Sequence, residues 1–149
     1  MLKDKIAIIT GGSRGIGAAI AEKLASLGAN IAVLFAGNSE AAQQVCHKCS
    51  ETYGVKAVSY RCNVGDFHET KQTVAAAKAE FGSIDILVNN AGITRDGLVA
   101  LMKESDFDDV ISTNLKGAFN MIRHCAPIFI RNHTGKIINI TSVTGIMGN

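Results

Sequence analysis

Residues 10–17 read Thr10-Gly11-Gly12-Ser13-Arg14-Gly15-Ile16-Gly17, and this stretch decides the fold. It follows the apolar run Ile6–Ile9 and precedes a helical pattern at Ala18–Leu24. A short buried strand, a glycine-rich turn and an amphipathic helix form the first unit of a dinucleotide-binding fold. Glycines let the backbone turn tightly and approach a pyrophosphate, which the free N–H groups and the positive end of the helix dipole then stabilise.

The glycine spacing of this turn is G-x-x-x-G-x-G, carried by Gly11, Gly15 and Gly17. It differs from the G-x-G-x-x-G of the best-known dinucleotide pattern. No Gly-Lys-Ser or Gly-Lys-Thr follows, which argues against a P-loop. Taken alone, the pattern is also compatible with a tight turn that binds nothing, so the rest of the chain has to decide.

The length and composition of the chain indicate a single domain. Its 149 residues are enough to bury a core. The net charge of +2 is too small to favour nucleic acid as a partner. Lys3, Asp4 and Lys5 lead straight into the first strand, so no signal peptide is expected. No apolar run approaches the length of a membrane span, so no membrane partner is expected either.

The four cysteines are scattered along the chain, which is typical of reduced thiols in a cytoplasmic protein. Cys46-His47-Lys48-Cys49 resembles half of a zinc site, but the sequence has no second pair of cysteines to complete it. This segment lies inside a helical pattern with no strand leading into it, so we interpret it as helix surface. The histidines show no metal-ligand spacing, and no metal is expected.

Apolar strand-like runs alternate with longer helical patterns, which is typical of a parallel sheet covered on both faces. Strands are expected at Lys5–Thr10, Asn30–Phe35, Lys56–Arg61, Ile84–Asn89 and Lys136–Thr141. Helices are expected at Arg14–Leu27, Ser39–Tyr53, Phe67–Phe81 and Phe107–Asn132. Left-handed C-caps are expected just past these helices, at Gly28, Gly54, Gly82 and Gly135. The prediction is one α/β domain over residues 1–149, a Rossmann-like, doubly wound parallel sheet.

The segment after the second strand indicates which dinucleotide is bound. An NAD pocket usually places Asp or Glu about 20 residues past the glycines, to hold the ribose 2′-hydroxyl. Here that stretch is Phe35-Ala36-Gly37-Asn38, with no acid before Glu40. Arg14 stands at the positive end of a helix, where a cation is unfavourable by about 0.3–1 kcal/mol unless an anion binds above it. A guanidinium suits a 2′-phosphate, so we expect NADPH/NADP+; a solvated surface arginine is the alternative.

Two further segments belong at the crevice of such a sheet. Asn63-Val64 closes the third strand, on the adenine side, and Asp66 beyond it is a candidate N-cap. Asn89-Asn90-Ala91-Gly92 follows the fourth strand. Its amides and small residues are typical of strand ends at a ligand crevice, although adjacent asparagines also form turns.

These motifs together resemble the short-chain dehydrogenase/reductase family. Within it, three longer strings resemble the 3-oxoacyl-acyl-carrier-protein reductases, namely NNAGITRDGL at Asn89–Leu98, STNLKGAF at Ser112–Phe119 and SVTGIMGN at Ser142–Asn149. Acetoacetyl-CoA reductases carry a similar NNAGITRD string, and the segment Gly145–Asn149 favours the acyl-carrier-protein branch. The resemblance covers the whole chain, with the motifs in matching order.

The resemblance implies roles for individual residues. Ser142 matches the family's catalytic serine, and Asn114 matches its catalytic asparagine. The implied cofactor-binding residues are Gly11, Gly12, Ser13, Arg14, Gly15, Ile16, Gly17, Asn63, Val64, Asn89, Ala91 and Gly92. A serine hydroxyl at the end of the fifth strand can hydrogen-bond a ketone oxygen where negative charge grows during hydride delivery. No G-x-S-x-G surrounds Ser142, so an acyl-enzyme nucleophile is not indicated.

The chain departs from the family in one respect. The family uses a Tyr-x-x-x-Lys downstream of the serine, in which the tyrosine protonates the carbonyl oxygen and the lysine lowers its pKa. The two tyrosines here, Tyr53 and Tyr60, lie upstream and are followed four residues later by Ala57 and Val64. We therefore expect the chain to be the N-terminal part of a reductase, inactive by itself.

The activity that the resemblance implies is NADPH-dependent reduction of 3-oxoacyl thioesters, linked to acyl carrier protein, to 3-hydroxyacyl thioesters in fatty acid biosynthesis. An acetoacetyl-CoA reductase, another short-chain dehydrogenase and a non-catalytic nucleotide-binding domain remain alternatives. The resemblance also implies a homotetramer, which the wide apolar surface of the helix at Phe107–Asn132 favours.

Two charged clusters flank that helix. The basic residues Arg123, Arg131, His133 and Lys136 are a candidate surface for an acidic carrier protein, although the helix dipole alone explains a basic helix end. At the other end, we interpret Ser105 and Asp108 as a cap with acids that match the dipole, rather than as paired catalytic carboxylates.

Overall fold

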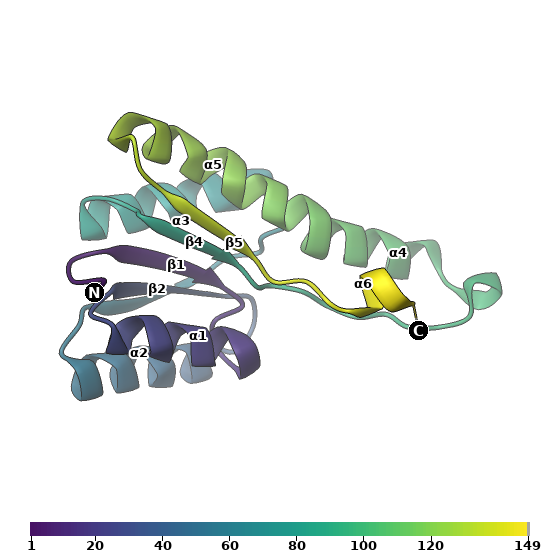
Figure 1. The fold of residues 1–149 in the computed structure, drawn as a ribbon. Helices are drawn as coiled ribbons and strands as arrows, with labels where there is room; N and C mark the ends of the chain where they lie inside the picture. The colour runs from purple at the N-terminus through teal and green to yellow at the C-terminus, as the bar shows by residue number, and fades with distance from the viewer. Residues whose placement is uncertain (149) are drawn as a thin grey trace.

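The computed structural model describes residues 1–148 and contains one sheet of five parallel strands in the order β3-β2-β1-β4-β5 (Figure 1). The strands are β1 (Ile6–Thr10), β2 (Asn30–Phe35), β3 (Ala57–Arg61), β4 (Ile86–Asn89) and β5 (Lys136–Asn139). Asn149, the last residue of the SVTGIMGN string, lies outside the described residues. The expected parallel α/β fold is confirmed, with some strands one or two residues shorter at their ends.

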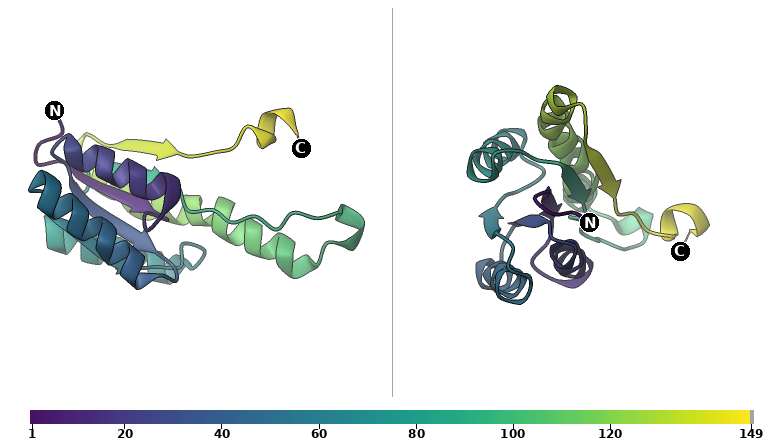
Figure 2. Two further views of the ribbon diagram at one scale, coloured as in Figure 1. Left: turned by 90° about the horizontal axis from the view of Figure 1, so that it is seen from below. Right: turned by 60° about the vertical axis from the view of Figure 1, so that its left-hand side comes forward.

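Helices cover both faces of the sheet, as the two views of Figure 2 show. The helices are α1 (Gly15–Ser26), α2 (Ser39–Tyr53), α3 (Phe67–Phe81), α4 (Glu104–Val110), α5 (Gly117–Asn132) and α6 (Thr144–Met147). One face carries α1 and α2, and the opposite face carries α3 and α5. Among the described residues, no helix is both long enough and apolar enough to cross a membrane.

The core consists of two apolar layers, one on each side of the sheet. Alternate residues of β1 enter different layers, because Ala7 and Ile9 pack toward α1 and α2 while Ile8 packs toward α3 and α5. The central strands are therefore buried on both faces, which is why they read as continuous apolar runs rather than alternating ones.

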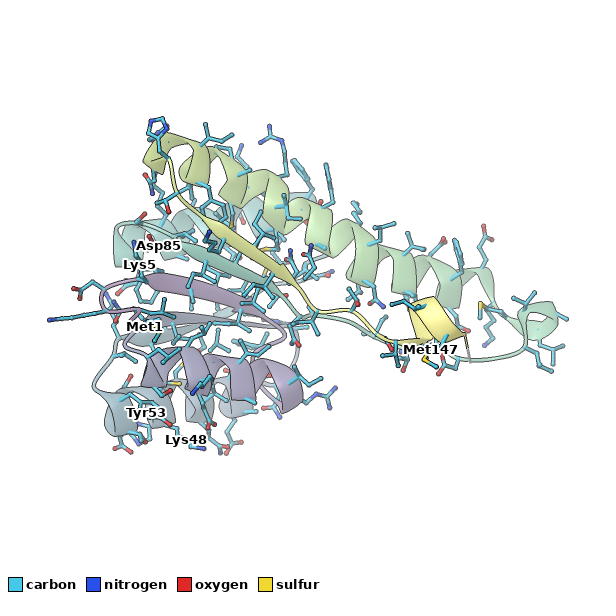
Figure 3. All side chains as sticks on the ribbon, viewed as in Figure 1. Met1, Lys5, Lys48, Tyr53, Asp85 and Met147 are labelled. Atoms are coloured by element: carbon cyan, nitrogen blue, oxygen red, sulfur yellow. The ribbon has the colours of Figure 1, made fainter. Side chains whose placement is uncertain are left out.

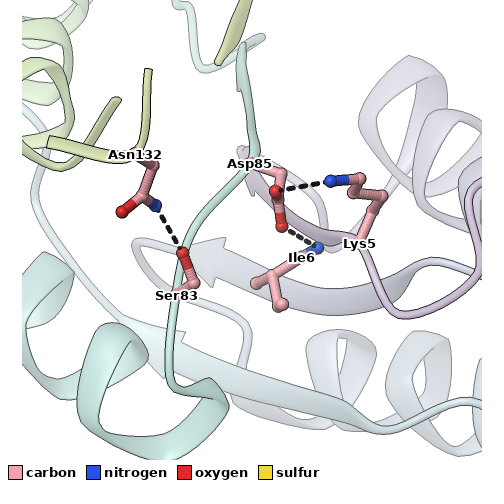
Figure 4. Close-up of polar contacts among 5 residues, drawn as sticks. All are labelled: Lys5, Ile6, Ser83, Asp85 and Asn132. Atoms are coloured by element: carbon pink, nitrogen blue, oxygen red, sulfur yellow. Dashed lines mark hydrogen bonds and ion pairs between the residues drawn. The ribbon is translucent and has the colours of Figure 1, made fainter. Parts of the chain in front are cut away.

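The amino ends of the strands are joined by polar contacts (Figure 4). Asp85, just before β4, accepts hydrogen bonds from the Lys5 ammonium at 3.1 Å and from the backbone N–H of Ile6 at 3.0 Å. Asn132, at the end of α5, donates to the hydroxyl of Ser83 at 2.8 Å. These contacts anchor the starts of β1 and β4 and the end of α5 at the edge opposite the glycine turn.

The long helix expected at Phe107–Asn132 begins earlier and is interrupted. It starts as α4 at Glu104, passes through a π-helical turn at Ile111–Lys116 and continues as α5, which contains Pro127. The predicted Ser105 cap is wrong, since the N-cap position is Lys103 and no side chain caps the helix. Acidic residues do occupy the first turn, as expected.

Two other local predictions are wrong. Cys46 and Cys49 are buried in the core between α2 and the sheet rather than on the helix surface, and burial raises the pKa of Cys46 to about 11. His133, not Gly135, takes the left-handed conformation after α5, with φ 50°. Gly135 is needed for space instead, because a Cβ there would collide with the Phe129 ring.

Candidate active site

A cleft of about 530 Å³ opens at the carboxyl edge of the sheet, next to the glycine turn. Five segments line it, contributed by the turn after β1, the loop after β2, the end of β3, the loop after β4 and the π-helical turn at Ile111–Lys116. This edge of an open parallel sheet is where ligands of such folds bind.

The glycines of the turn provide close approach between backbone segments. Gly11 has φ +63°, and a Cβ there would come within 3.0 Å of the Ala91 Cα. A Cβ on Gly17 would collide with the carbonyl of Gly11 and with the amide of Asn90. Gly15 has φ +56° and faces open space. The turn therefore packs tightly on the sheet side and leaves its backbone exposed on the other.

The N-terminus of α1 lies at this cleft with no anionic neighbour. Arg14 is the N-cap residue, its side chain makes no capping bond, and the first turn holds no acidic residue. Arg14 is exposed, lines the cleft and forms no ion pair within residues 1–148. The positive end of a 12-residue helix and a guanidinium are thus both available to an anion.

The segment Phe35–Asn38 lines the neighbouring wall and offers no carboxylate. Asn38 is the N-cap of α2, and its Oδ1 accepts a hydrogen bond from the Ala41 N–H at 2.9 Å. Glu40 stands in the first turn of that helix, where the dipole favours it, and does not line the cleft.

Asn63 and Val64 form the wall at the end of β3. The Oδ1 of Asn63 accepts from the Gly65 N–H at 3.0 Å, and its own N–H donates to the Glu69 carboxylate at 3.0 Å. Asp66 caps α3 as expected, accepting from the Glu69 N–H at 2.8 Å, and this bond lowers the pKa of Asp66.

Thr10 ties the loop after β4 to the glycine turn. Its hydroxyl oxygen accepts from the backbone N–H groups of Asn90 at 3.0 Å and Ala91 at 2.9 Å. The Asn90 side chain in turn donates to the carbonyls of Thr10 and Gly11. The glycine turn and the Asn89–Gly92 motif are therefore linked directly by hydrogen bonds.

Asn114 lies in the π-helical turn and holds the loop after β4 from the other side. Its amide makes two hydrogen bonds to the backbone of Ile93, which lines the main cleft. Asn114 also lines a smaller cavity of about 110 Å³, together with Asn89 and Thr141. Asn89 is nearly buried there and donates to the side chain of Asn139 at 2.9 Å.

Ser142 follows Thr141 in the exposed segment before α6. Its Oγ accepts from the Thr144 hydroxyl at 2.7 Å and from the Thr144 N–H at 3.3 Å. The chain thus brings Asn114 and the residue preceding Ser142 to the same cavity, at the same edge of the sheet.

The implied cofactor-binding residues divide into two groups. Those that line the main cleft are Gly11, Ser13, Arg14, Asn63, Val64, Ala91 and Gly92. Those that do not line it are Gly12, Gly15, Ile16, Gly17 and Asn89. Within the second group, Gly12 and Gly17 provide space for neighbouring backbone, and Asn89 faces the smaller cavity.

Several lining residues were not singled out from the sequence. These are Cys62, Ile93 and Thr113, all of which line the cleft. Ile93 and Thr113 adjoin the recognised motifs NNAG and Asn114, so adjacency to a motif is the signal that would have found them.

Neither tyrosine stands at the cleft. Tyr53 ends α2 at the edge of the sheet opposite α6, which carries Met147, as Figure 3 shows. Tyr60 lies on β3, where burial raises its pKa, and its hydroxyl is buried with no partner among the described residues. No tyrosine within residues 1–148 is therefore placed to protonate a ligand in the cleft.

The residues that are present fit a nicotinamide dinucleotide. The glycine turn exposes its backbone, the helix end and Arg14 offer positive charge, and Asn63 and Val64 form a separate wall. This combination matches a ligand with phosphates at its centre and a base at one end.

The family model described as short chain dehydrogenase matches residues 5–149. The 3-oxoacyl-[acyl-carrier-protein] reductase FabG of Staphylococcus aureus (strain Mu50) is 48% identical over 149 residues, which cover 100% of this chain and 60% of that protein. The FabG of Escherichia coli (strain K12) is 42% identical over 147 residues, which cover 99% of this chain and 58% of that protein. The chain therefore spans about 60% of the length of these curated relatives.

Two solved structures are similar over nearly the whole chain. A metagenomic short-chain oxidoreductase in complex with NADP is 37% identical with a TM-score of 0.91, covering 97% of this chain and 65% of that one. An NAD+-bound xylitol dehydrogenase is 34% identical with a TM-score of 0.94, covering 99% of this chain and 56% of that one. The two differ in the cofactor that they hold.

Proposed function

The chain belongs to the short-chain dehydrogenase family, and from this premise we propose that the complete protein is an NADPH-dependent 3-oxoacyl-[acyl-carrier-protein] reductase. It would convert 3-oxoacyl thioesters to 3-hydroxyacyl thioesters in fatty acid biosynthesis, in the cytoplasm. The observation that carries the proposal is the cleft itself, in which Arg14, Asn63 and the loop held by Asn114 converge at one edge of the sheet.

The choice of NADPH over NADH rests on charge. No carboxylate lines the cleft at Phe35–Asn38, where it would repel a 2′-phosphate and hold a 2′-hydroxyl. Arg14 is exposed at the mouth of the same cleft with no anionic partner among residues 1–148. A planar guanidinium can bind a phosphate with two parallel hydrogen bonds.

When bound, the nicotinamide cofactor supplies the hydride. The chain's own residues orient and polarise the ketone. We assign Ser142 to the carbonyl oxygen: its Oγ accepts a hydrogen bond from Thr144, which leaves its own O–H free to donate. A donor placed where negative charge grows stabilises the transition state more than the ground state. We assign Asn114 to holding Ile93 in place, and with it the loop after β4.

The proton for the new hydroxyl has to come from another group. This sequence contains no Tyr-x-x-x-Lys that could match the family's tyrosine and lysine. The curated relatives extend well beyond the matched region. We propose that the complete protein supplies this pair after residue 149.

Assembly and carrier docking complete the proposal. An exposed apolar row runs along the helix that spans α4 and α5, with Phe107, Ile111, Leu115 and Phe119 at four-residue spacing. Such a row favours burial against another subunit, in agreement with a homotetramer.

Four basic residues are exposed along the later part of α5 and at the start of β5 and are the proposed contacts for an acidic carrier, namely Arg123, Arg131, His133 and Lys136.

The test begins with the gene. Sequence beyond codon 149 should encode Tyr-x-x-x-Lys in frame, and a stop codon there would favour the non-catalytic nucleotide-binding alternative. The complete protein should then oxidise NADPH with acetoacetyl-acyl-carrier protein faster than with acetoacetyl-CoA at equal concentration. Equal or reversed rates would favour a coenzyme A-linked reductase.

A further inference from the structure

Helix α5 reaches across to the adenine-side wall of the cleft through one buried hydrogen bond. Asn120 is fully buried, and its Nδ2 donates to the carbonyl oxygen of Val64 at 2.8 Å. The two residues are 56 positions apart in the chain. Val64 itself is 6% exposed and lines the cleft.

Neighbouring contacts press the same helix against the same loop. Gly117 lies against Val64, and a Cβ there would collide with the valine side chain. A Cβ on Gly65 would likewise collide with the hydroxyl of Ser112. One turn beyond Asn120, the His124 ring is 3.0 Å from the carbonyl oxygen of Phe67. Positions 117, 120 and 124 share one face of a helix, so this face contacts the loop at Val64 and the first residue of α3 at Phe67.

The loop held in this way carries the wall residues Cys62, Asn63 and Val64. The Asn63 side chain is fixed in turn by the Gly65 N–H, which belongs to the same clamped loop. A shift of the Val64–Gly65 peptide therefore moves both the Val64 side chain and the Asn63 amide. The position of the wall depends on the contacts made by α5.

We infer that Asn120 is a positioning residue that sets the adenine-side wall of the cofactor cleft, an inference that rests on the proposed use of NADPH. The bond from Nδ2 to Val64 is the only polar contact of this side chain among the described residues, since its Oδ1 has no partner there. A buried amide is costly unless it is hydrogen-bonded, whereas an apolar residue of similar size would pack without that cost. The hydrogen bond to the Val64 carbonyl is therefore the reason for an amide, rather than an apolar side chain, at position 120.

Through Asn114 and Asn120, one continuous helical segment holds two loops of the cleft. Its π-helical turn holds the loop after β4 through Asn114, and its next turns hold the loop after β3 through Asn120. Both loops line the same cleft. The spacing of the two walls is therefore set by a single element rather than by two independent loops.

The test measures binding of the adenosine half of the cofactor alone. Asn120→Leu and Asn120→Asp are made in the complete protein, and the Kd for adenosine 2′,5′-bisphosphate is measured by calorimetry at pH 8.5. Both variants should bind at least tenfold more weakly than wild type. The KM for NADPH should rise by the same factor, and kcat should fall less than the affinity does, although Val64 also borders the smaller cavity beside Asn114.

The aspartate variant provides a rescue. Its ionised carboxyl cannot donate to the Val64 carbonyl, whereas the protonated form can, and burial favours the protonated form. Relative to wild type at the same pH, its affinity for adenosine 2′,5′-bisphosphate should recover by at least threefold at pH 5.5. The leucine variant has no such group and should not recover. If the leucine variant does not fold, the pH dependence of the aspartate variant carries the test.

Two variants on the same helix serve as controls. Cys125→Ala removes a buried side chain that faces the core. Asn132→Ala removes the hydrogen bond from the side-chain amide to Ser83, at the far end of α5. Both should bind adenosine 2′,5′-bisphosphate within twofold of wild type. An Asn120 variant that also does so would overturn the inference, as would an equal loss of affinity in Cys125→Ala.

The proposed function can fail separately. A wild-type protein that binds adenosine 2′,5′-bisphosphate but does not reduce an acetoacetyl thioester would refute the proposed reaction and leave the role of Asn120 measurable. A wild-type protein that binds neither this ligand nor NADPH would overturn both.

Discussion

Asn114 forms hydrogen bonds to the backbone of Ile93 through both the oxygen and the nitrogen of its side-chain amide. Its Oδ1 accepts from the Ile93 N–H at 2.8 Å, and its Nδ2 donates to the Ile93 carbonyl at 2.9 Å. The side chain thereby forms the two hydrogen bonds that a neighbouring strand would form with Ile93, which lies in the part of the loop, residues 90–98, that has no secondary structure. The contact joins the π-helical turn to the loop that lines the cleft.

This contact predicts graded effects for two substitutions at Asn114. Asn114→Leu removes both hydrogen bonds and should lower kcat of the complete protein at least tenfold. Asn114→Asp keeps the acceptor for the Ile93 N–H and should lose less. Each neutral hydrogen bond contributes about 0.5–1.5 kcal/mol. Steady-state kinetics and thermal unfolding check the order, and equal kcat losses in the two variants would contradict it.

Arg14 should determine the preference between the two nicotinamide cofactors. The complete protein should bind NADPH more than tenfold more tightly than NADH, a difference of about 1.4 kcal/mol. Arg14→Ala should remove most of this preference by weakening NADPH alone. Fluorescence titration with both cofactors measures it. Lys23→Ala, at the other end of α1, is the matched loss of a cation and should leave the ratio unchanged.

Asp85 should stabilise the fold more than its ion-pair partner does (Figure 4). The Asp85 side chain is only 14% exposed and accepts the Ile6 N–H, so Asp85→Ala leaves a strand-end donor unpaired. The free energy of unfolding should fall by about 1–3 kcal/mol. Lys5 is 48% exposed, and Lys5→Ala should cost only about 0–1 kcal/mol. Urea unfolding compares the two, and a larger loss for Lys5→Ala would refute this account.

Charge reversal at Arg131 should weaken the use of a carrier-linked substrate. Arg131 lies in the last turn of α5 and is exposed. In Arg131→Glu, kcat/KM for acetoacetyl-acyl-carrier protein should fall at least fivefold, while that for a small thioester analogue stays within twofold. Lys23→Glu reverses a charge in the last turn of α1 and is the control. Identical losses on both substrates would remove the carrier from the account.

Residues 1–149 expressed alone should not turn over. No tyrosine within residues 1–148 stands at the cleft, and loss of a positioned acid costs about 10²–10⁴ in rate. NADPH absorbance with an acetoacetyl thioester measures the remaining activity. Turnover within tenfold of the complete protein would mean that the proton comes from a residue already described.

The sequence was sufficient to predict most of the fold. Continuous apolar runs such as Ile6–Thr10 and Asn30–Phe35 are strands because both faces are buried, and a run of this kind is readable without tertiary information. The break between α4 and α5 could not be read in the same way. Asn114 in that break is paired with a loop 21 residues earlier, and helical periodicity contains no trace of such a contact.

The parts of the candidate site formed by residues adjacent in the sequence could be predicted. The parts formed by contacts between residues far apart in the sequence could not. The glycines act through their own backbone, so their spacing alone located the turn. Thr10 acts on Asn90, 80 residues away, and Asn120 acts on Val64, 56 residues away. Nothing in the surrounding residues distinguishes Asn120 from a surface asparagine, because its partner is a backbone carbonyl that any residue could provide.

The position of β1 at the centre of the sheet has a consequence for how the chain is made. Each later strand pairs with one that has already left the ribosome: β2 and β4 flank β1, β3 adds to β2, and β5 adds to β4. Synthesis at about 5–20 residues per second therefore extends the sheet outward from its first strand. A late start at an internal codon that omits residues 1–10 would remove this central strand and leave two unconnected pairs, whereas early termination only narrows the sheet from its rim.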